Sequence, residues 1–339
     1  MEVKAQNWLI TGGCGFIGVN LVAHLLAQQP PPQIRILDNL SVGTRADLAA
    51  VSAFREIAGL DCQGPPQGVE LLVGDIRDPA TCLASCAGID IVVHLAANTG
   101  VAPSIADPRQ DLDINVLGTF NMLEAARQQG VKNFVFASSG AVVGEVMPPI
   151  TEDKPPKPVS PYGASKLAGE GYCSAYYRAF GVKTAVLRFG NVYGPRSKHK
   201  SSVVAKFFQL ALAGLPLEIY GDGQQTRDFI YIQDLIQAIM LAAASDVGGE
   251  VFQIATHKET TVNEIAEKIK ELVEGHTGRR VSLHYTAPRI GDVRRNYADI
   301  TKSKTILGYE PQYDLDQGLA ATLEYFLTTT LTNMGPTTP

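Results

Sequence analysis

Short apolar runs alternate with longer segments of helical periodicity through the first half of the chain. The runs are rich in Val, Ile, Leu and Phe, which is typical of strands buried on both faces. They occupy residues 8–11, 34–38, 69–73, 89–95, 133–138 and 184–189, and the clearest helical patterns between them lie at 18–28, 113–129 and 165–180. Strands that alternate with helices are joined by right-handed crossovers. The pattern therefore predicts an α/β fold with a doubly wound parallel sheet.

This alternation breaks after Tyr193. Gly194-Pro195 opens a loop whose basic side chains are Arg196, Lys198, His199 and Lys200. Helical patterns follow at 203–213, 235–244, 262–273 and 315–327, with strand-like runs at 229–232, 251–255 and 281–285. We interpret this half as a smaller α/β lobe that is interleaved with the last strands of the sheet.

The predicted domain boundaries follow from this interpretation. The larger domain comprises residues 1–193 and about 226–257, and the smaller lobe comprises about 194–225 and 258–327. The last residues, 328–339, have no periodicity and are expected to be disordered.

Composition narrows the classes of function. A chain of 339 residues is long enough for about two domains. With 45% hydrophobic and 19% charged residues it is globular and not disordered. Its 29 Lys and Arg against 34 Asp and Glu give a net charge of −5, so nothing attracts a nucleic acid polymer or an anionic membrane. The expected partner is a small molecule.

Cysteine and histidine usage points to a reduced, cytoplasmic protein without a metal. The 5 cysteines contain no CxxC pair and no leader segment precedes them. The 6 histidines are scattered and form no HExxH or Cys/His cluster, so no metal site is expected. The longest apolar stretch, 235–244, is too short to span a bilayer.

A glycine-rich turn between the first strand and the first helix predicts a dinucleotide site. The segment TGGCGFIG at 11–18 offers Gly12 for a tight turn, Gly15 for close approach of a pyrophosphate and Gly18 for packing of helix on strand. Asp38 closes the second strand, where an acid binds the ribose hydroxyls, and no arginine immediately follows it. The glycine turn predicts a Rossmann-type sheet, and Asp38 favours NAD over NADP. The alternative is that Asp38 is a simple turn residue before Asn39.

Further candidates end neighbouring strands on the same edge. Asp75 follows the third strand and is a candidate for adenine contact or an ordinary turn former. Ala96 and Ala97 follow the fourth strand, where small side chains let a cofactor lie flat across the strand ends.

Tyr162 and Lys166 are four residues apart at the start of a helical segment and therefore share one face. A nearby ammonium group lowers the pKa of a phenol, as a general base requires. The alternative is an ordinary exposed pair. Ser138 and Ser139 end the fifth strand on the active edge, where their hydroxyls either bind the substrate and the tyrosine or cap the following turn.

In combination these motifs resemble the extended short-chain dehydrogenase/reductases, in particular the NAD-dependent nucleotide-sugar epimerases and dehydratases. The resemblance reaches about residue 327 and rests on TGGCGFIG, DNLSVG (38–43), GDIRD (74–78), HLAA (94–97), SSG (138–140), YGASK (162–166), RFGNVYGPR (188–196) and GDGQQTRDFIYIQDL (221–235). It implies catalytic roles for Ser139, Tyr162 and Lys166, and a supporting role for Asn115 under the active-site helix.

The resemblance also implies a set of ligand contacts. Those expected for NAD are Gly12, Gly15, Phe16, Ile17, Gly18, Asp38, Asn39, Ser41, Gly43, Asp75, Ile76, Leu95, Ala96, Ala97, Asn115, Ser138, Tyr162, Lys166 and Phe189. Those expected for the substrate are Ser139, Asn191, Arg227 and Arg289 at the diphosphate, Asp292 at the nucleotide ribose and Asn296 at the sugar. Arginine suits a diphosphate because its guanidinium offers paired donors; the alternatives are ion pairs of Arg227 with Asp222 or Asp228 and a solvated Arg289.

The residues after Ser139 narrow the reaction. Dehydratases of this family carry an Asp-Glu pair there and decarboxylases usually a glutamate, but this chain has no carboxylate before Glu145. We therefore predict 4-epimerisation of a UDP-sugar, namely a hexose, an N-acetylhexosamine or a uronate. The alternatives are 2-epimerisation, reduction of a keto-sugar, dehydration, or a non-catalytic dinucleotide sensor.

Three departures from the family pattern bear on the substrate. Val143 and Gly190 stand where many members have tyrosine and phenylalanine, and Asn296 stands at a position said to gate sugar size. The positive charges of Arg294 and Arg295 favour an acidic sugar such as a uronate. The family further implies a homodimer with a four-helix interface formed by 113–129 and 165–180.

Overall fold

An eight-stranded parallel sheet is the largest element of the computed structural model, which describes residues 6–58, 62–288 and 293–333. The strand order is β12-β7-β6-β5-β1-β2-β4-β3. The strands are β1 (Asn7–Thr11), β2 (Gln33–Asp38), β3 (Arg55–Ile57), β4 (Val69–Val73), β5 (Ile91–His94), β6 (Asn133–Ser139), β7 (Lys183–Phe189) and β12 (Glu250–Ile254). The predicted doubly wound, Rossmann-type sheet is confirmed, because the order reverses between β1 and β5 as in that fold.

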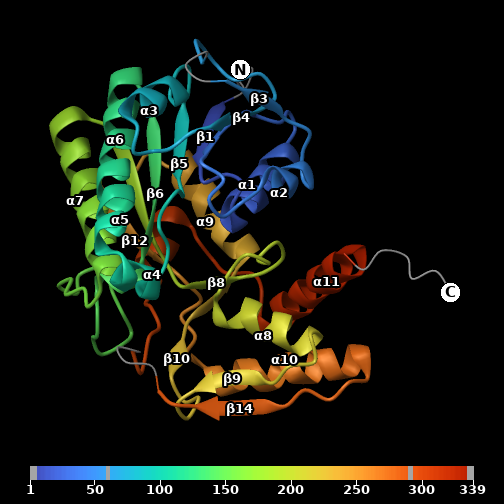
Figure 1. Ribbon diagram of the computed structural model, residues 1–339. Coiled ribbons are helices and arrows are strands. Elements are labelled where there is room, and N and C mark those ends of the chain that lie inside the picture. The colour runs from blue at the N-terminus through green and yellow to red at the C-terminus, as the bar shows by residue number, and fades with distance from the viewer. Residues whose placement is uncertain (1–5, 59–61, 289–292, 334–339) are drawn as a thin grey trace.

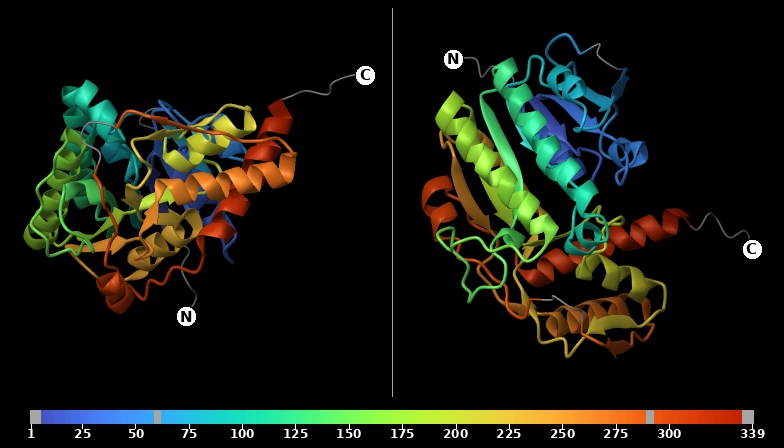
Figure 2. Two further views of the ribbon diagram at one scale, coloured as in Figure 1. Left: turned by 90° about the horizontal axis from the view of Figure 1, so that it is seen from below. Right: turned by 60° about the vertical axis from the view of Figure 1, so that its left-hand side comes forward.

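Helices cover both faces of this sheet (Figures 1 and 2). On one face lie α3 (Pro79–Ser85), α6 (Gly118–Gln129) and α7 (Pro161–Phe180), and on the other lie α1 (Phe16–Leu26) and α9 (Ile232–Ala244). Successive strand residues point to opposite faces. Leu9 therefore belongs to one buried cluster and Ile10 to the other, which explains the continuous apolar runs in the sequence.

Short helices and turns follow several strands at the carboxyl edge of the large sheet. They are α2 (Arg45–Ala49), α4 (Val101–Ala106), α5 (Pro108–Leu112), a π-helical turn at Asp113–Leu117 and a 3-10 turn at Gly140–Val142. The helix expected at 113–129 thus begins with a π-turn that runs into α6. Such turns commonly occur at functional sites.

The remaining elements form a smaller part of the molecule, at the bottom of Figure 1. They are β8 (Asn191–Tyr193), α8 (Val203–Leu212), β9 (Leu217–Tyr220), β10 (Thr226–Arg227), β11 (Phe229–Tyr231), β13 (Thr260–Thr261), α10 (Val262–Thr277), β14 (Leu283–Thr286) and α11 (Leu315–Asn333). A π-turn at Ser303–Leu307 packs instead against α9 and β12. β9 pairs with β14 in parallel, and β10 pairs with β13 antiparallel.

Two sequence predictions need correction here. The run at 229–232 does not join the large sheet, because β11 pairs with β8 in a separate two-stranded sheet; only β12 joins the edge beside β7. Residues 328–333 were expected to be disordered, but α11 continues to Asn333. The hydroxyls of Thr328 and Thr329 donate to carbonyls of the preceding turn, which keeps these polar side chains compatible with a helix.

Candidate functional site

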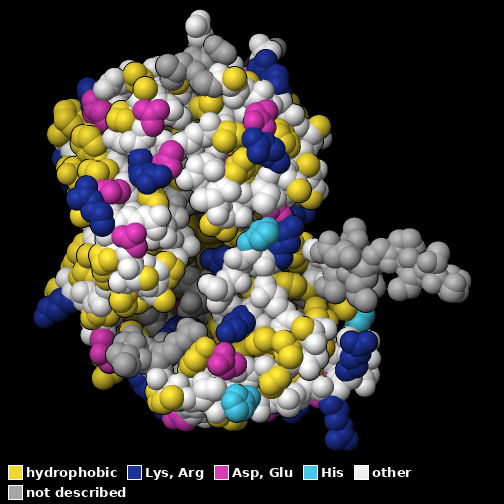
Figure 3. Space-filling model, in the orientation of Figure 1, with side chains coloured by type: hydrophobic (Ala, Val, Ile, Leu, Met, Phe, Trp, Pro, Cys, Tyr) yellow, Lys and Arg dark blue, Asp and Glu magenta, His cyan; other side chains and the backbone are white. Residues whose placement is uncertain are grey.

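The predicted site residues gather at the carboxyl edge of the large sheet. The glycine turn follows β1, Asp38 ends β2, Leu95, Ala96 and Ala97 follow β5, and Ser139 ends β6. Ligands of open parallel sheets bind outside this edge, at the point where the strand order reverses. A hollow between the large sheet region and the smaller part is visible in the space-filling view (Figure 3).

The glycine turn is closely packed and leaves the N-terminus of α1 open. Gly12 has φ of +67°, and a Cβ there would lie 2.9 Å from the backbone nitrogen of Ala96. A Cβ on Gly43 would lie 2.2 Å from the carbonyl oxygen of Cys14. The N-cap of α1, Gly15, offers no side-chain cap, and the first turn holds no acid. Free backbone N–H groups at a helix N-terminus suit a pyrophosphate, so this turn fits a dinucleotide.

The acids expected at the adenosine end lie together. Asp38 is buried and accepts hydrogen bonds from the backbone of Cys14 (2.9 Å) and Leu40 (2.8 Å). Burial raises the pKa of Asp38, and these two hydrogen bonds oppose the shift. Asp75 accepts from Asn39 (3.0 Å) and from Arg77, whose guanidinium holds the pKa of Asp75 well below its usual range. The two carboxyl groups are thus fixed by the turns that follow β2 and β4.

Other predicted cofactor residues line the same edge. Ser41 donates its backbone N–H to Asn39 at 3.1 Å, Ile76 is buried, and Phe189 ends β7 in a partly buried position. Phe16 and Ile17 form the first turn of α1.

The start of α7 brings Tyr162 beside Ser139. Ser160 caps the helix by accepting from the backbone of Gly163 at 3.1 Å, and Pro161 occupies the first helical position. The Ser139 hydroxyl accepts from the backbone of Ala141 at 3.2 Å, and it lies beside the Tyr162 phenol, whose pKa it lowers. Both uses foreseen for this serine, turn capping and contact with the tyrosine, therefore occur together.

Lys166 lies one turn further along α7 and is almost fully buried, with 3% of its surface exposed. Its ammonium group donates to the carbonyl oxygen of Ala137 at 2.9 Å and lies 5.0 Å from the centre of the Phe136 ring. Burial lowers the pKa of Lys166 to about 8, and the negative charge of Asp111 opposes this shift. A buried lysine with so low a pKa is typical of a functional site.

The expected lowering of the Tyr162 pKa does not appear in the structure. Burial raises the pKa of the Tyr162 phenol, the Ser139 hydroxyl opposes this shift, and the charge of Asp111 adds to it. The desolvation of the phenolate therefore outweighs the groups that favour it in the protein alone.

Asp111 was not foreseen from the sequence. It is 1% exposed on α5, accepts from the Asn115 side chain at 2.9 Å and is hydrogen-bonded to Ser165. Burial raises the pKa of Asp111, while Ser165, the charge of Lys166 and Asn115 lower it. Its spacing of four residues from Asn115 on one helix face is the sequence feature that could have revealed it.

Asn115 and Ser138 take structural positions. The Asn115 side chain donates to Asn98 (3.0 Å) and to Ser165 on α7 (3.1 Å), as expected of a residue that supports the active-site helix. The Ser138 hydroxyl instead donates to Glu170 at 2.5 Å, and Glu170 forms a buried ion pair with Arg188 at 2.7 Å. The hydroxyl of Ser138 is thus directed away from the open edge.

The predicted substrate residues lie in or beside the smaller part. Arg227 donates to the carbonyl oxygens of Thr226 (2.6 Å) and Val293 (2.7 Å). Asn191 is exposed on β8 and Asn296 is partly buried. Arg289 and Asp292 lie outside the described residues. The structure therefore does not test the diphosphate contact expected for Arg289 or the ribose contact expected for Asp292.

The acidic residues near the predicted substrate residues have partners other than Arg227 in the structure. Asp222 pairs with Arg294 at 2.8 Å, and Glu259 pairs with Arg295 at 2.7 Å. Asp228 accepts four hydrogen bonds, from the backbone and hydroxyl of Thr256 and from the backbones of His257 and Ala298. In the protein alone, each of these two arginines is paired with a carboxylate, and the structure does not test their role toward an acidic sugar.

Val143 and Gly190 each have a local packing role. Val143 is fully buried in a small cluster with Val142 and Ile150. A Cβ on Gly190 would lie 2.9 Å from the carbonyl oxygen of Asp228, so this glycine lets two backbone segments approach. Their small size reflects local packing.

Three further features concern metal ligands, membrane spans and cysteines. The described residues contain no group of three or more His, Cys, Asp or Glu side chains able to hold a metal ion. Within the same ranges, no helix has the length and apolar character needed to cross a bilayer. All five cysteines are buried.

The fold and the residues at its carboxyl edge define a dinucleotide-dependent enzyme of the Rossmann class. Residues 8–255 match the NAD dependent epimerase/dehydratase family, and the chain belongs to that family. It is an epimerase-type enzyme that uses NAD.

Individual relatives match over nearly the whole chain. A UDP-glucose 4-epimerase of Mycolicibacterium smegmatis is 36% identical over 94% of this chain and 97% of its own. The structure of the Thermotoga maritima UDP-glucose 4-epimerase with UDP-glucose has a TM-score of 0.85, is 36% identical and covers 96% of this chain and 100% of that one. A Methanobrevibacter ruminantium UDP-N-acetylglucosamine 4-epimerase in complex with UDP-N-acetylmuramic acid has a TM-score of 0.86 at 30% identity, covering 96% and 100%.

Proposed function

We propose that this protein interconverts the C4 epimers of a UDP-sugar through transient oxidation at C4, with Tyr162 as the base. The observation that carries the proposal is the position of Tyr162 beside Ser139 and one helical turn from the buried Lys166, at the edge where the glycine turn suits a dinucleotide. The relatives named above as UDP-sugar 4-epimerases support the substrate class.

Each residue has a defined task in this reaction. Tyr162 takes the proton of the C4 hydroxyl, and Ser139 donates a hydrogen bond to the same oxygen or to the phenolate. Bound NAD supplies the acceptor and donor of hydride for C4, and its positive charge opposes the effect of burial on the Tyr162 pKa. The 4-keto sugar then turns its other face toward the cofactor site. When hydride has returned to C4, Tyr162 gives the proton back to the C4 oxygen and the epimer is formed.

The ligands would be held from both parts of the molecule. We propose that Gly12, Gly15 and the first turn of α1 bind the pyrophosphate of NAD, and that Asp38 binds its ribose hydroxyls. Asn191 and Arg227, together with Arg289, would hold the substrate diphosphate. This division corresponds to a cofactor-binding domain and a smaller substrate-binding lobe.

Dehydration is the less favoured reaction at this site. Elimination of water needs a further acid and base, and the turn after Ser139 holds only Gly140, Ala141 and the buried Val142 and Val143. A 2-epimerase or keto-sugar reductase would work with the same residues but needs a cofactor that exchanges. A non-catalytic dinucleotide sensor would not need the tyrosine.

The test combines cofactor retention and turnover. The purified protein is examined by ultraviolet spectroscopy for retained NAD and then incubated with UDP-glucose, UDP-N-acetylglucosamine and UDP-glucuronate, with resolution of the C4 isomers. Retained NAD and isomerisation of at least one sugar are expected. Absence of turnover on all three, with a Tyr162→Phe variant identical to the wild type, would refute the proposal.

We also propose a homodimer formed through α6 and α7. Exposed hydrophobic side chains collect on these helices and at the start of α6, namely Leu117 (46% exposed), Phe120 (37%), Tyr172 (39%) and Phe180 (56%). Hydrophobic side chains gather along the left edge of the space-filling view, in the region where Figure 1 draws α7 (Figures 1 and 3). Sedimentation should give a dimer for the wild type and a monomer for Phe120→Asp; a monomeric wild type contradicts this.

A further inference from the structure

The basic loop between β8 and α8 is attached to the cofactor side of the large sheet. Arg196 donates to the Asn20 side chain on α1 at 2.9 Å. Lys198 and His199 both contact Asp47 on α2, at 2.7 and 3.1 Å. Three of the four basic groups of this loop thus hold it against the two helices that follow β1 and β2.

Lys200 differs from its three neighbours. Its ammonium group lies 5.8 Å from the centre of the Phe16 ring. Within the described ranges it forms no ion pair, and the only effect on its pKa is burial, which lowers it. A partly buried ammonium group that faces an aromatic ring alone is poorly solvated and lacks an anion.

Phe16 is the first residue of α1, so Lys200 lies at the open N-terminus of that helix. This terminus has no side-chain cap and no acid in its first turn. A helix N-terminus and an uncompensated lysine both favour an anion in the space between them. Basic side chains also border the hollow in the space-filling view (Figure 3).

We propose that Lys200 contacts the pyrophosphate of bound NAD and so fastens the loop of the smaller part over the cofactor. The contact is a charge-assisted hydrogen bond from the ammonium group to a phosphate oxygen. It would make retention of the cofactor depend on a residue outside the glycine turn. This inference rests on the placement of NAD at α1 in the proposed function but is independent of the sugar.

The test is the dissociation constant of NAD, measured by calorimetry on protein from which the cofactor has been removed. Lys200→Gln should raise this constant by about tenfold or more, as expected for loss of one hydrogen bond to a charged group. Lys200→Arg should restore part of the affinity. Lys198→Gln removes the same charge two residues away and is the matched control, with an expected change below about twofold because it contacts Asp47 at the surface.

Two further measurements locate the contact. The Lys200→Gln effect should also appear with ADP-ribose but not with adenosine, which has no phosphate. If Lys200→Gln binds NAD like the wild type, or weakens only the binding of UDP, the proposal is overturned while the epimerase stands. If the wild type binds no NAD at all, the proposed function itself fails.

Discussion

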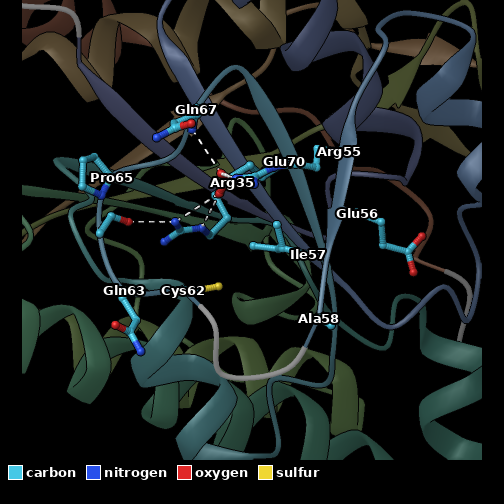
Figure 4. A pocket seen from close by; sticks show the side chains of 11 residues that line it. Arg35, Arg55, Glu56, Ile57, Ala58, Cys62, Gln63, Pro65, Gln67 and Glu70 are labelled. Atoms are coloured by element: carbon cyan, nitrogen blue, oxygen red, sulfur yellow. Dashed lines mark hydrogen bonds and ion pairs between the residues drawn. The ribbon is translucent and has the colours of Figure 1, made fainter.

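Two buried basic groups, at opposite ends of the parallel sheet, differ in how their charge is compensated. Arg35, in the amino-terminal half of β2, lies beside Glu70 (Figure 4). It uses all of its N–H groups: it donates to Glu70 twice and to the carbonyl oxygens of Gly64, Ser85 and Ala87. Lys166, beneath the carboxyl edge, has one hydrogen bond to a carbonyl oxygen and an aromatic ring.

The consequences for the acid groups nearby also differ. Burial raises the pKa of Glu70, but hydrogen bonds from Arg55, Gln67 and Arg35 outweigh it and hold the pKa below its usual range. Near Lys166, burial raises the pKa of Tyr162 and of Asp111. A fully bonded buried charge stabilises the fold, whereas incompletely compensated groups retain unusual pKa values that chemistry can use.

The largest expected effect is on activity. Tyr162→Phe should lower the epimerisation rate by about 10³-fold, the size typical of losing a general base, because no other phenol lies beside Ser139 in the described residues. NAD binding and the thermal midpoint should change little. Tyr177→Phe removes a phenol from the same helix and should be fully active; a large loss there would mean that α7 responds to any such change.

The next effect is on stability at the opposite end of the sheet. Arg35→Met should lower the free energy of unfolding by about 3–5 kcal/mol, since it removes two hydrogen bonds from buried Glu70 and the donor from three carbonyl oxygens. The rate per folded molecule should be unchanged. Arg55→Met is the control, because the Arg55 side chain is 62% exposed, and should cost below about 1 kcal/mol. Equal losses in urea unfolding would remove the distinction between the two.

Lys166 should reveal itself in the pH dependence of stability. Its folded pKa of about 8 lies below the ordinary value of 10.5, so the unfolded chain binds more protons between these values and stability rises with pH there. Relative to Lys166→Met, the wild type should gain roughly 2 kcal/mol between pH 8 and 9.5. Urea unfolding at both pH values measures this gain. If the difference in stability between wild type and Lys166→Met is the same at both pH values, folding does not lower the pKa of Lys166.

His94 gives the smallest expected effect. It is fully buried between Thr11 (2.7 Å) and Thr119 (3.0 Å), and burial lowers its pKa from 6.5 to about 3. The unfolded chain therefore binds a proton below pH 6.5 that the folded protein does not, so stability falls as the pH falls. Between pH 7 and 5.5 the wild type should lose about 1.4 kcal/mol more than His94→Gln. A parallel decline of both would contradict a neutral His94.

The sequence predicted the parallel sheet well because strands buried on both faces are continuous apolar runs. It misplaced 229–232 because local pattern does not reveal which strand is the partner, and β11 found β8 instead of the large sheet. It missed the helical continuation of 328–333 because threonine hydroxyls there bond to the preceding turn.

The site was predictable where spacing alone decides, as for Tyr162, Lys166 and Asp38. It was not predictable where a long-range partner decides. The direction of Ser138 depends on Glu170, and the burial of Asp111 depends on α7. Gly190 stands where many family members have phenylalanine, and only the structure shows that a small residue here allows the close approach of the Asp228 backbone.

The most direct test of the central claim is the fate of a label at C4. UDP-glucose carrying deuterium at C4 is incubated with the wild-type protein in ordinary water, and the product is examined by NMR and mass spectrometry. Transient oxidation by a retained cofactor predicts that the C4 epimer keeps its deuterium at C4. Formation of the epimer with loss of deuterium to water would contradict the account.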